Sequence, residues 1–181
     1  MFHKDVIIAL LALLLTACSN YSYVTVEDSS TQLSVKLPKA SIVSPSQYDY
    51  YPYIFRELDV FEDISEGYTN KGLEIRVQRS SAPKNRGVTF TSLIISAATF
   101  FVVPSVGQFQ ETLDFSVYED GKLIDSYNYS ATKYITVWLF NSPNSLDEST
   151  ISKKMDTEIS KQFTQALYND YKEEGGKKPI Q

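Results

Sequence analysis

The stretch Phe109–Phe140, FQETLDFSVYEDGKLIDSYNYSATKYITVWLF, decides the fold of this chain. Its first part alternates apolar and polar residues, which is the period of a strand with one buried face. Asp120-Gly121 then fits the tight turn of a β-hairpin, and a second strand should return from Leu123 to about Leu139. The sequence therefore predicts a long β-hairpin. Its alternating apolar residues are Leu113, Phe115 and Val117.

Shorter strands are expected ahead of this hairpin. The segment Gly72–Ser80, GLEIRVQRS, alternates in the same way. Leu73, Ile75 and Val77 should lie on one face and Glu74, Arg76 and Gln78 on the other. Leu33–Leu37, LSVKL, forms a second candidate strand that Pro38 stops. A further short strand fits between Tyr21 and Val26.

Two amphipathic helices complete the expected elements. The first lies within Ser44–Tyr68, begins either with the pair Ser46 and Asp49 or with Pro52 in its first turn, and ends at Gly67. Its apolar face consists of Ile54, Leu58 and Phe61. The second helix begins at a capping box, Ser145 and Glu148, and ends before Gly175. Its apolar stripe consists of Ile151, Met155, Ile159, Phe163, Ala166 and Leu167.

This order predicts an α+β fold, a two-layer sandwich. We expect an antiparallel or mixed sheet of about four strands with two helices on one face, and an apolar insert between strands at about 88–106. One domain should cover residues 33–174, with a tether at 18–32 before it and a disordered tail at 175–181.

The N-terminus predicts the compartment. Val6–Leu15 is an apolar segment of signal-peptide length, and Leu15-Thr16-Ala17-Cys18 follows it. This motif resembles the lipobox of bacterial lipoproteins. The resemblance implies that residues 1–17 are removed and that Cys18 carries a diacylglycerol and an N-acyl chain, which anchor the chain to a membrane. Because Ser19 rather than aspartate follows the cysteine, the resemblance favours the periplasmic face of the outer membrane, with the inner membrane or the cell surface as alternatives.

Composition excludes several kinds of chemistry. His3 is the only histidine and Cys18 the only cysteine, so the mature chain has no imidazole and no free thiol. Serine or cysteine mechanisms that use histidine, and histidine or thiolate metal sites, are therefore excluded. The net charge of −5 gives no basic field for nucleic acid. We expect a protein that is not an enzyme and has no cofactor apart from its lipid chains.

A cluster of side chains in the first helix leaves one catalytic alternative open. Five carboxylates crowd together there, and a pair of them could act as acid and base or hold a cation. Nearby tyrosines could stack on a sugar. The simpler interpretation is the solvated face of an amphipathic helix. The carboxylates are Glu57, Asp59, Glu62, Asp63 and Glu66, and the tyrosines are Tyr48, Tyr50, Tyr51 and Tyr53.

The apolar run Gly87–Gln110, GVTFTSLIISAATFFVVPSVGQFQ, contains no charge. It is long enough to cross a membrane, but crossing would separate the hairpin and the second helix from their sheet and would oppose the positive-inside bias. Two interpretations remain, a buried core segment or a surface that contacts lipid or a partner. Burying the four apolar residues from Phe100 to Val103 stabilises by roughly 6–10 kcal/mol, so something must cover them. The candidate contact residues are Leu93, Ile94, Ile95, Phe100, Phe101, Val102 and Val103, with Arg79, Lys84 and Arg86 as a basic shoulder.

The order of elements is similar to that of envelope-assembly lipoproteins such as the lipopolysaccharide-assembly lipoprotein that plugs its outer-membrane barrel. That family usually begins Cys-Gly-Phe, whereas this mature chain begins Cys18-Ser19-Asn20. The resemblance implies a binding, assembly or transport accessory factor of the cell envelope, with the membrane and an envelope protein as partners. A carboxylate-based hydrolase or saccharide-binding lipoprotein is the alternative, and a purely structural lipoprotein is a third.

Overall fold

The computed structural model describes residues 23–25, 35–45, 50–100, 102–137 and 148–173. These residues belong to two compact units. The α3 unit comprises Met1–Val24, Pro83–Phe109 and Thr132–Ile151, and the sandwich unit comprises Thr25–Ala82, Gln110–Ala131 and Ser152–Gln181. Residues 33–174, which are predicted to form one domain, are divided between the two units. Predictions for Cys18, Ser46, Tyr48, Phe101, Ser145 and residues 175–181 lie outside the described residues.

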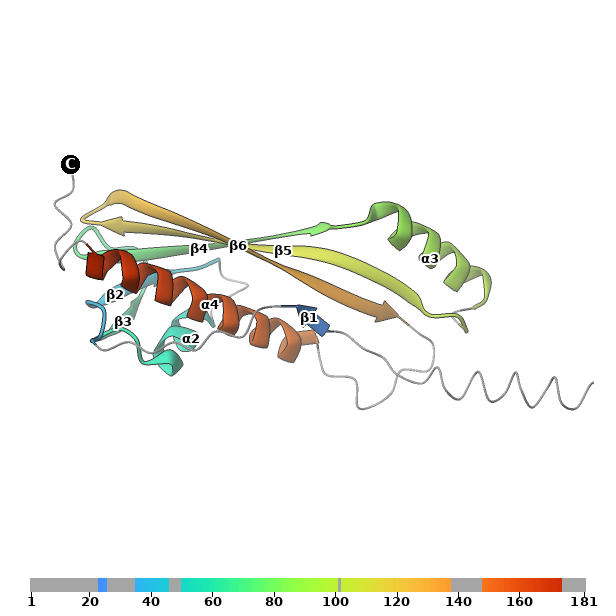
Figure 1. Cartoon of the computed structure of the whole chain (residues 1–181), viewed down its shortest axis with the longest axis horizontal. Coiled ribbons are helices and arrows are strands. Elements are labelled where there is room, and N and C mark those ends of the chain that lie inside the picture. Colours follow the sequence, from blue (N-terminus) through green and yellow to red (C-terminus); the bar gives the residue numbers. More distant parts are fainter. Residues whose placement is uncertain (1–22, 26–34, 46–49, 101, 138–147, 174–181) are drawn as a thin grey trace, which may run out of the picture. The chain divides into compact units, whose positions relative to one another are not determined.

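Six strands form one sheet within the described ranges, in the order β1-β6-β5-β4-β2-β3. β2 pairs in parallel with both β3 and β4, whereas β5 and β6 form the predicted hairpin, so the sheet is mixed (Figure 1). Asp120 and Gly121 both have positive φ, 49° and 78°, as the tight turn requires. The strands are β1 Tyr23–Thr25, β2 Ala40–Val43, β3 Ile64–Glu66, β4 Leu73–Pro83, β5 Ser105–Glu119 and β6 Lys122–Val137.

Helix α2 spans Tyr51–Leu58, with Pro52 in its first turn as predicted. The prediction that it continues to Gly67 is wrong, because Asp59 adopts a left-handed conformation with φ 51° and ends the helix. Aspartate accepts this conformation more readily than most residues. Phe61 is therefore not helical. It lies in an extended segment before β3, forms a β-bridge with Leu37 and is buried.

The first strand of the sandwich unit also differs from its prediction. Leu37 forms only an isolated bridge, and the strand β2 begins after Pro38, at Ala40. The alternating pattern was misleading because Val35 is exposed, while Ala40, Ser41 and Ile42 are all buried.

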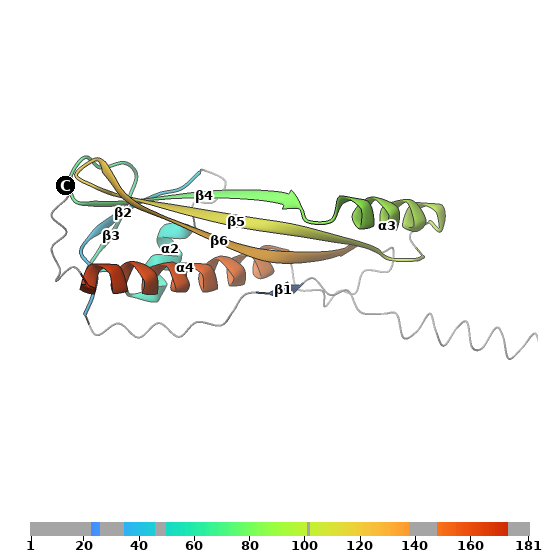
Figure 2. The ribbon, with the colours of Figure 1, turned by 45° about the horizontal axis from the view of Figure 1, so that its top comes forward.

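The core of the sandwich unit lies between the sheet and two helices on one of its faces, α2 and α4 (Figure 2). Helix α4 spans Glu148–Glu173. The Phe163 ring of α4 stacks on Phe115 of β5 at 4.3 Å, and Phe55 of α2 meets both rings edge-on, at 6.0 and 6.4 Å. The two-layer α+β arrangement with two helices on one face is therefore confirmed. The predicted stripe of α4 is buried, apart from the half-buried Ala166.

Candidate functional site

The apolar run forms neither a single strand nor a core helix. It contains helix α3, Arg86–Ala98, followed by a turn and the start of β5. The Asn85 side chain caps the helix by accepting a hydrogen bond from the Val88 amide at 3.3 Å. The helix ends at Thr99, and Phe100 follows with a positive φ of 51°.

Small hydroxyl residues form the inner face of α3. They recur at helical spacing and are the residues of the segment that are least exposed. The hydroxyl of Ser92 donates to the Val106 carbonyl at 2.9 Å and accepts from the Val106 amide at 3.3 Å, which joins the helix to the start of β5. Gly107 lies close to this contact, since a Cβ there would come within 3.7 Å of the Thr89 methyl group. The inner face consists of Thr89, Ser92, Ser96 and Thr99.

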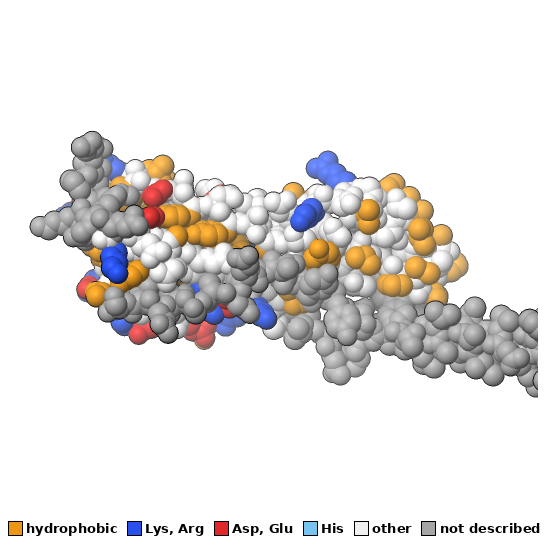
Figure 3. Space-filling view, viewed as in Figure 1, with side chains coloured by type: hydrophobic (Ala, Val, Ile, Leu, Met, Phe, Trp, Pro, Cys, Tyr) orange, Lys and Arg blue, Asp and Glu red, His pale blue; other side chains and the backbone are white. Residues whose placement is uncertain are grey.

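Large apolar side chains form the outer surface of the same segment. Nine of them are exposed between Val88 and Val106, from 38% for Val106 to 83% for Phe100. On the helix they cover roughly 220° of the circumference, at 100° per residue. Figure 3 shows apolar side chains over α3, with no acidic side chain beside them in that view. We call these residues the α3 surface: Val88, Phe90, Leu93, Ile94, Ile95, Phe100, Val102, Val103 and Val106.

This distribution is the reverse of the usual amphipathic helix. A helix on a water-soluble core turns its apolar stripe inward and its polar residues outward. In α3 the hydroxyl groups face β5 and the apolar residues face outward. Small residues and hydroxyls at the packed interface are typical of helices that pack inside a membrane. Lipid tails there are as apolar as a leucine side chain, so close packing and hydrogen bonds rather than apolar burial hold the helices together. The α3 surface is therefore built for apolar surroundings.

The charged residues around the α3 surface are all basic. From Pro83 to Phe109 and from Thr132 to Val137 the charged residues are Lys84, Arg86 and Lys133, with no aspartate or glutamate. The acidic residue in the described part of the α3 unit is Glu148, at the start of α4. Lys84 and Arg86 are exposed, whereas Lys133 is buried. The Lys84 ammonium donates to the Thr132 hydroxyl at 2.8 Å.

Arg79 lies elsewhere, in the sandwich unit, and its side chain is only 6% exposed. Its Nε contacts Glu111 at 3.0 Å and its Nη1 contacts Asp156 at 3.0 Å. This burial corrects the expectation that Arg79 adds a basic charge beside the apolar run. Its chemistry is that of a buried ion-pair network, which also includes Tyr50, whose hydroxyl donates to Asp156 Oδ2.

The Arg79 network contains two carboxylates for one guanidinium. Asp156 is fully buried, and its Oδ1 has no hydrogen-bond partner among the described residues. Burial raises the pKa of the Asp156 carboxyl, and the nearby Arg79 only partly opposes this. This network was not predicted from the sequence, because polar residues on a helix usually face solvent. Asp156, Ser160 and Thr164 are nevertheless all buried, and their spacing of four residues indicates that they share one side of α4.

Of the predicted contact residues, Leu93, Ile94, Ile95, Phe100, Val102 and Val103 all lie on the α3 surface. Sequence reasoning missed Val88, Phe90 and Val106, which belong to the same surface. For Val88 and Phe90 the signal that could have found them is the regular spacing of Thr89, Ser92, Ser96 and Thr99, which identifies the inner face of the helix. Val106 lies in β5 and has no such signal.

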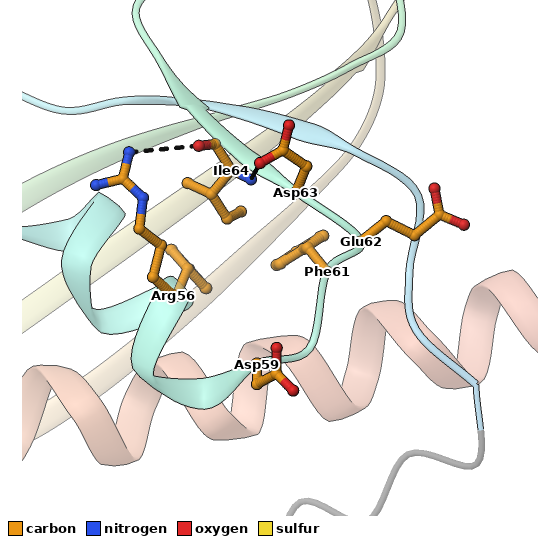
Figure 4. Close-up of a pocket in the computed structure, with 7 residues that line it drawn as sticks. Arg56, Asp59, Phe61, Glu62, Asp63 and Ile64 are labelled. Carbon is orange, nitrogen blue, oxygen red and sulfur yellow. Dashed lines mark hydrogen bonds between the residues drawn. The ribbon is translucent and has the colours of Figure 1, made fainter.

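The carboxylates of the first predicted helix do not converge. All five are exposed, and several have cationic neighbours: Lys36 for Asp59, Arg56 for Glu66 and Lys153 for Glu57. A pocket of about 240 Å³ lies beside them, lined by Phe55, Phe61 and Ile64 and by polar side chains. In Figure 4, Asp59, Glu62 and Asp63 point in different directions around this pocket. The tyrosines do not share a surface either, because Tyr51 is buried and Tyr53 is exposed.

Two searches of the described residues complete the survey. None of the helices there is both long enough and apolar enough to cross a membrane. No group of histidine, cysteine and carboxylate side chains in the same part of the chain could hold a metal ion.

No protein-family model and no curated protein matches the chain. Among solved structures it is similar to a minor lipoprotein from Acinetobacter baumannii, with 14% identity over 73% of this chain and 93% of that one, at a TM-score of 0.45. A rare lipoprotein B from Shewanella oneidensis matches with 13% identity over 76% and 93% of the two chains, at a TM-score of 0.33. An uncharacterized lipoprotein B from Nitrosomonas europaea matches with 7% identity over 77% and 91%, at a TM-score of 0.42.

These likenesses are to proteins named as lipoproteins, but each has a TM-score below 0.5 and an identity below 25%. They carry no argument about the fold or function of this chain. Its assignment as a lipoprotein depends on the motif Leu15-Thr16-Ala17-Cys18.

Proposed function

We propose that this protein is a lipoprotein anchored through Cys18 to the periplasmic face of the outer membrane, and that it acts by binding rather than by catalysis. Its role is that of an accessory factor in envelope assembly or transport. The α3 surface is its second contact with the membrane and lies in lipid. Residues 1–17 serve as the signal peptide, and no cofactor is needed beyond the lipid chains on Cys18.

The observation that carries this proposal is the reversed helix α3. Fully burying one large apolar side chain stabilises by about 1.5–3 kcal/mol. Even half of that value for each of nine side chains amounts to on the order of 10 kcal/mol. An apolar surface whose burial would release this much free energy is best accommodated in an apolar environment. Exposed apolar patches of this size mark interaction sites.

Lipid is the occupant that the remaining observations favour. The lipobox holds the chain at a bilayer, so membrane contact needs no further recruitment. The exposed charges next to the surface, Lys84 and Arg86, are basic and suit the anionic face of a membrane. The hydroxyl interface between α3 and β5 is also the kind that forms in lipid.

Flotation with vesicles of phosphatidylethanolamine and phosphatidylglycerol tests the proposal. The variant Ser19–Gln181 lacks the lipid anchor, so only the α3 surface can hold it to the vesicles. We expect this protein to float and its Phe100→Asp/Val102→Asp variant to remain in the lower fractions. A matched control, Val35→Asp/Leu123→Asp, changes two equally exposed apolar residues of the sandwich unit and should float like the parent.

Circular dichroism checks that each variant is folded, which is expected because the changed side chains are exposed. If the parent stays in the lower fractions, or if both double variants float equally well, the α3 surface is not a lipid contact. Binding to an envelope protein in the absence of lipid affinity would likewise overturn the choice of lipid.

The hydrolase or saccharide-binding alternative has less support. A catalytic pair needs at least two carboxylates turned into a shared cleft. All five candidates are exposed, and the side chains of Asp59, Glu62 and Asp63 point in different directions. Their cationic neighbours match the simpler interpretation of a solvated helix face.

A further inference from the structure

We infer that α3 enters a single leaflet upright, with Phe100 leading, to a depth at which Arg86 and Lys84 meet the lipid phosphates. This inference rests on the proposed function and adds an orientation and a depth to it. Three independent features carry it: the distribution of apolar residues around the helix, the pairing of polar groups at its tip, and its length.

The distribution of apolar residues opposes a helix that lies flat on the membrane. A helix in the interface plane needs a polar face toward water and an apolar face toward lipid. Around α3, exposed apolar residues cover roughly 220°, and the rest of the circumference packs on β5 through the hydroxyl face. A flat orientation would leave part of the α3 surface in water, for example Ile95 or Phe90, whereas an upright one surrounds it with acyl chains.

Several polar groups at the tip of α3 are paired with one another. The Thr99 hydroxyl donates to the carbonyls of Ile95 and Ser96, at 3.0 Å each, and accepts from the Val103 amide at 3.2 Å. The Phe100 amide donates to the Ala97 carbonyl at 3.0 Å, and the Val102 amide donates to Thr99 at 3.0 Å. Helix ends normally expose unpaired carbonyls, which are expensive in hydrocarbon. These hydrogen bonds lower the cost of transferring this end of the helix from water into hydrocarbon.

The opposite end of α3 is suited to the headgroup region. The Lys84 amide donates to the Gln108 carbonyl at 2.9 Å, so Lys84 lies level with a polar part of β5, and Arg86 is the first residue of the helix. Between Arg86 and Glu111 the chain has no charge. The basic residues therefore mark the level at which the uncharged part of the unit begins, and long basic side chains can reach phosphates from there.

The length of the helical segment matches this position. From Arg86 to Ala98, the last residue of α3, the helical rise is about 18 Å at 1.5 Å per residue. A bilayer is about 40–45 Å thick including its headgroups, so half of it is about 20–22 Å. With Arg86 at the phosphates, Phe100 therefore lies near the midplane, and α3 occupies one leaflet without crossing the membrane.

Depth-resolved spin labelling tests this orientation in the mature, lipid-anchored chain. Because Cys18 is the only cysteine and carries the anchor, a cysteine introduced at Val88, Ile95 or Phe100 is the only one that takes a nitroxide label. The relative accessibility of each label to oxygen and to a water-soluble nickel complex reports its depth in vesicles of phosphatidylethanolamine and phosphatidylglycerol. We expect depth to increase in the order 88, 95, 100, with about 10 Å between positions 88 and 95.

A label at Leu123, an exposed residue of the sandwich unit, serves as the control and should have the high ratio of nickel-complex to oxygen accessibility that is typical of a label in water. Labels of equal, shallow depth on α3 would overturn the upright orientation and leave the lipid contact intact. Labels on α3 that meet no lipid at all would overturn the proposed function as well.

Charge reversal tests the role of Arg86 separately. Arg86→Glu should lower binding of Ser19–Gln181 to these anionic vesicles about thirtyfold. Each basic residue near the surface contributes about 1 kcal/mol to binding, and charge reversal both removes this attraction and adds an equal repulsion. Lys122→Glu makes the same charge change at an exposed site of the sandwich unit and should leave binding within a few fold. Equal losses in both variants would show that Arg86 has no particular place at the headgroups.

Discussion

Phe100 combines a costly backbone conformation with an exposed aromatic ring. Its φ is 51°, in the left-handed region, and its side chain is 83% exposed. A residue other than glycine pays about 1–2 kcal/mol there. The ring is not covered by the core, so no packing contact within the described residues offsets this strain. The proposed lipid contact would offset this cost.

We therefore expect opposite effects on stability and on membrane binding when Phe100 becomes glycine. Phe100→Gly should raise the free energy of unfolding by about 0.5–1 kcal/mol, because glycine adopts this φ without strain. It should lower vesicle binding at least tenfold, because a large apolar side chain is lost. Urea unfolding and flotation measure the two quantities.

Asp59→Gly is the matched control, since Asp59 has the same φ of 51° and lies in the sandwich unit. It should leave vesicle binding unchanged. A Phe100→Gly protein that is less stable and binds vesicles as well as its parent would contradict this assignment of the residue.

Asp156 predicts a dependence of stability on pH. Its pKa in the folded protein is raised by burial, so the folded state holds a proton more tightly than the unfolded chain does. The contribution of this carboxyl to stability is present below its unfolded pKa of about 3.9 and is lost as pH rises through the folded pKa. In Asp156→Asn this loss is absent.

Urea unfolding of parent and Asp156→Asn across pH measures the effect. The neighbouring groups Arg79, Glu111 and Tyr50 are common to both proteins, so the difference between the two curves reports Asp156. We expect the variant to gain stability relative to the parent as pH rises above about 4. Two curves that stay parallel would show that the folded state leaves the pKa of Asp156 unchanged.

At the scale of elements, α3 depends on small residues along its inner face. Ser92 joins the helix to Val106, and Ser96 is fully buried. Ser92→Leu should therefore lift the helix from β5, at a cost of about 1–3 kcal/mol for overpacking. Amide hydrogen exchange at Val106 should then become at least tenfold faster, because its hydrogen bond to Ser92 is lost.

The neighbouring Thr91→Leu is the control, since it adds the same side chain on the exposed side of α3. Exchange at Val106 should not change in this variant, and vesicle binding should increase. If Thr91→Leu disturbs Val106 as strongly as Ser92→Leu does, the inner and outer faces of α3 are not distinct.

Sequence periodicity predicts the elements whose contacts are local. The β5–β6 hairpin needs only alternation and the Asp120-Gly121 turn, and α4 needs only a stripe at helical spacing, so both were predictable. The end of α2 depends on the left-handed conformation of a single residue, Asp59, and the parallel pairing of β2 with β3 and β4 depends on contacts between distant segments. Neither leaves a periodic signal.

The candidate site was predictable in its membership but not in its organisation. The absence of charge from Gly87 to Gln110 identifies an apolar segment. An unbroken apolar run cannot show which residues pack inward, since every position looks suited to a core. The basic shoulder was also only partly right, because sequence proximity placed Arg79 beside Arg86 although its partners, Glu111 and Asp156, are distant in sequence.

For the whole molecule, charge and apolar exposure are divided unevenly along the chain. The chain has a net charge of −5, yet the charged side chains from Pro83 to Phe109 are only Lys84 and Arg86. Nine exposed apolar side chains occur in that same range, between Val88 and Val106. The sandwich unit keeps its aromatic core buried, and its exposed surface carries most of its carboxylates, apart from the buried Glu74, Glu111 and Asp156.

The central claim is that the α3 surface lies in lipid in the cell, and photo-crosslinking of the lipid-anchored chain tests it most directly. Benzoylphenylalanine replaces Ile94, an exposed residue of the α3 surface, and in a control it replaces Leu123. After irradiation of intact envelopes, the account predicts that the chain labelled at position 94 gains the mass of a membrane lipid and that the control does not. A product at position 94 that contains only another protein, with no lipid adduct, would contradict it.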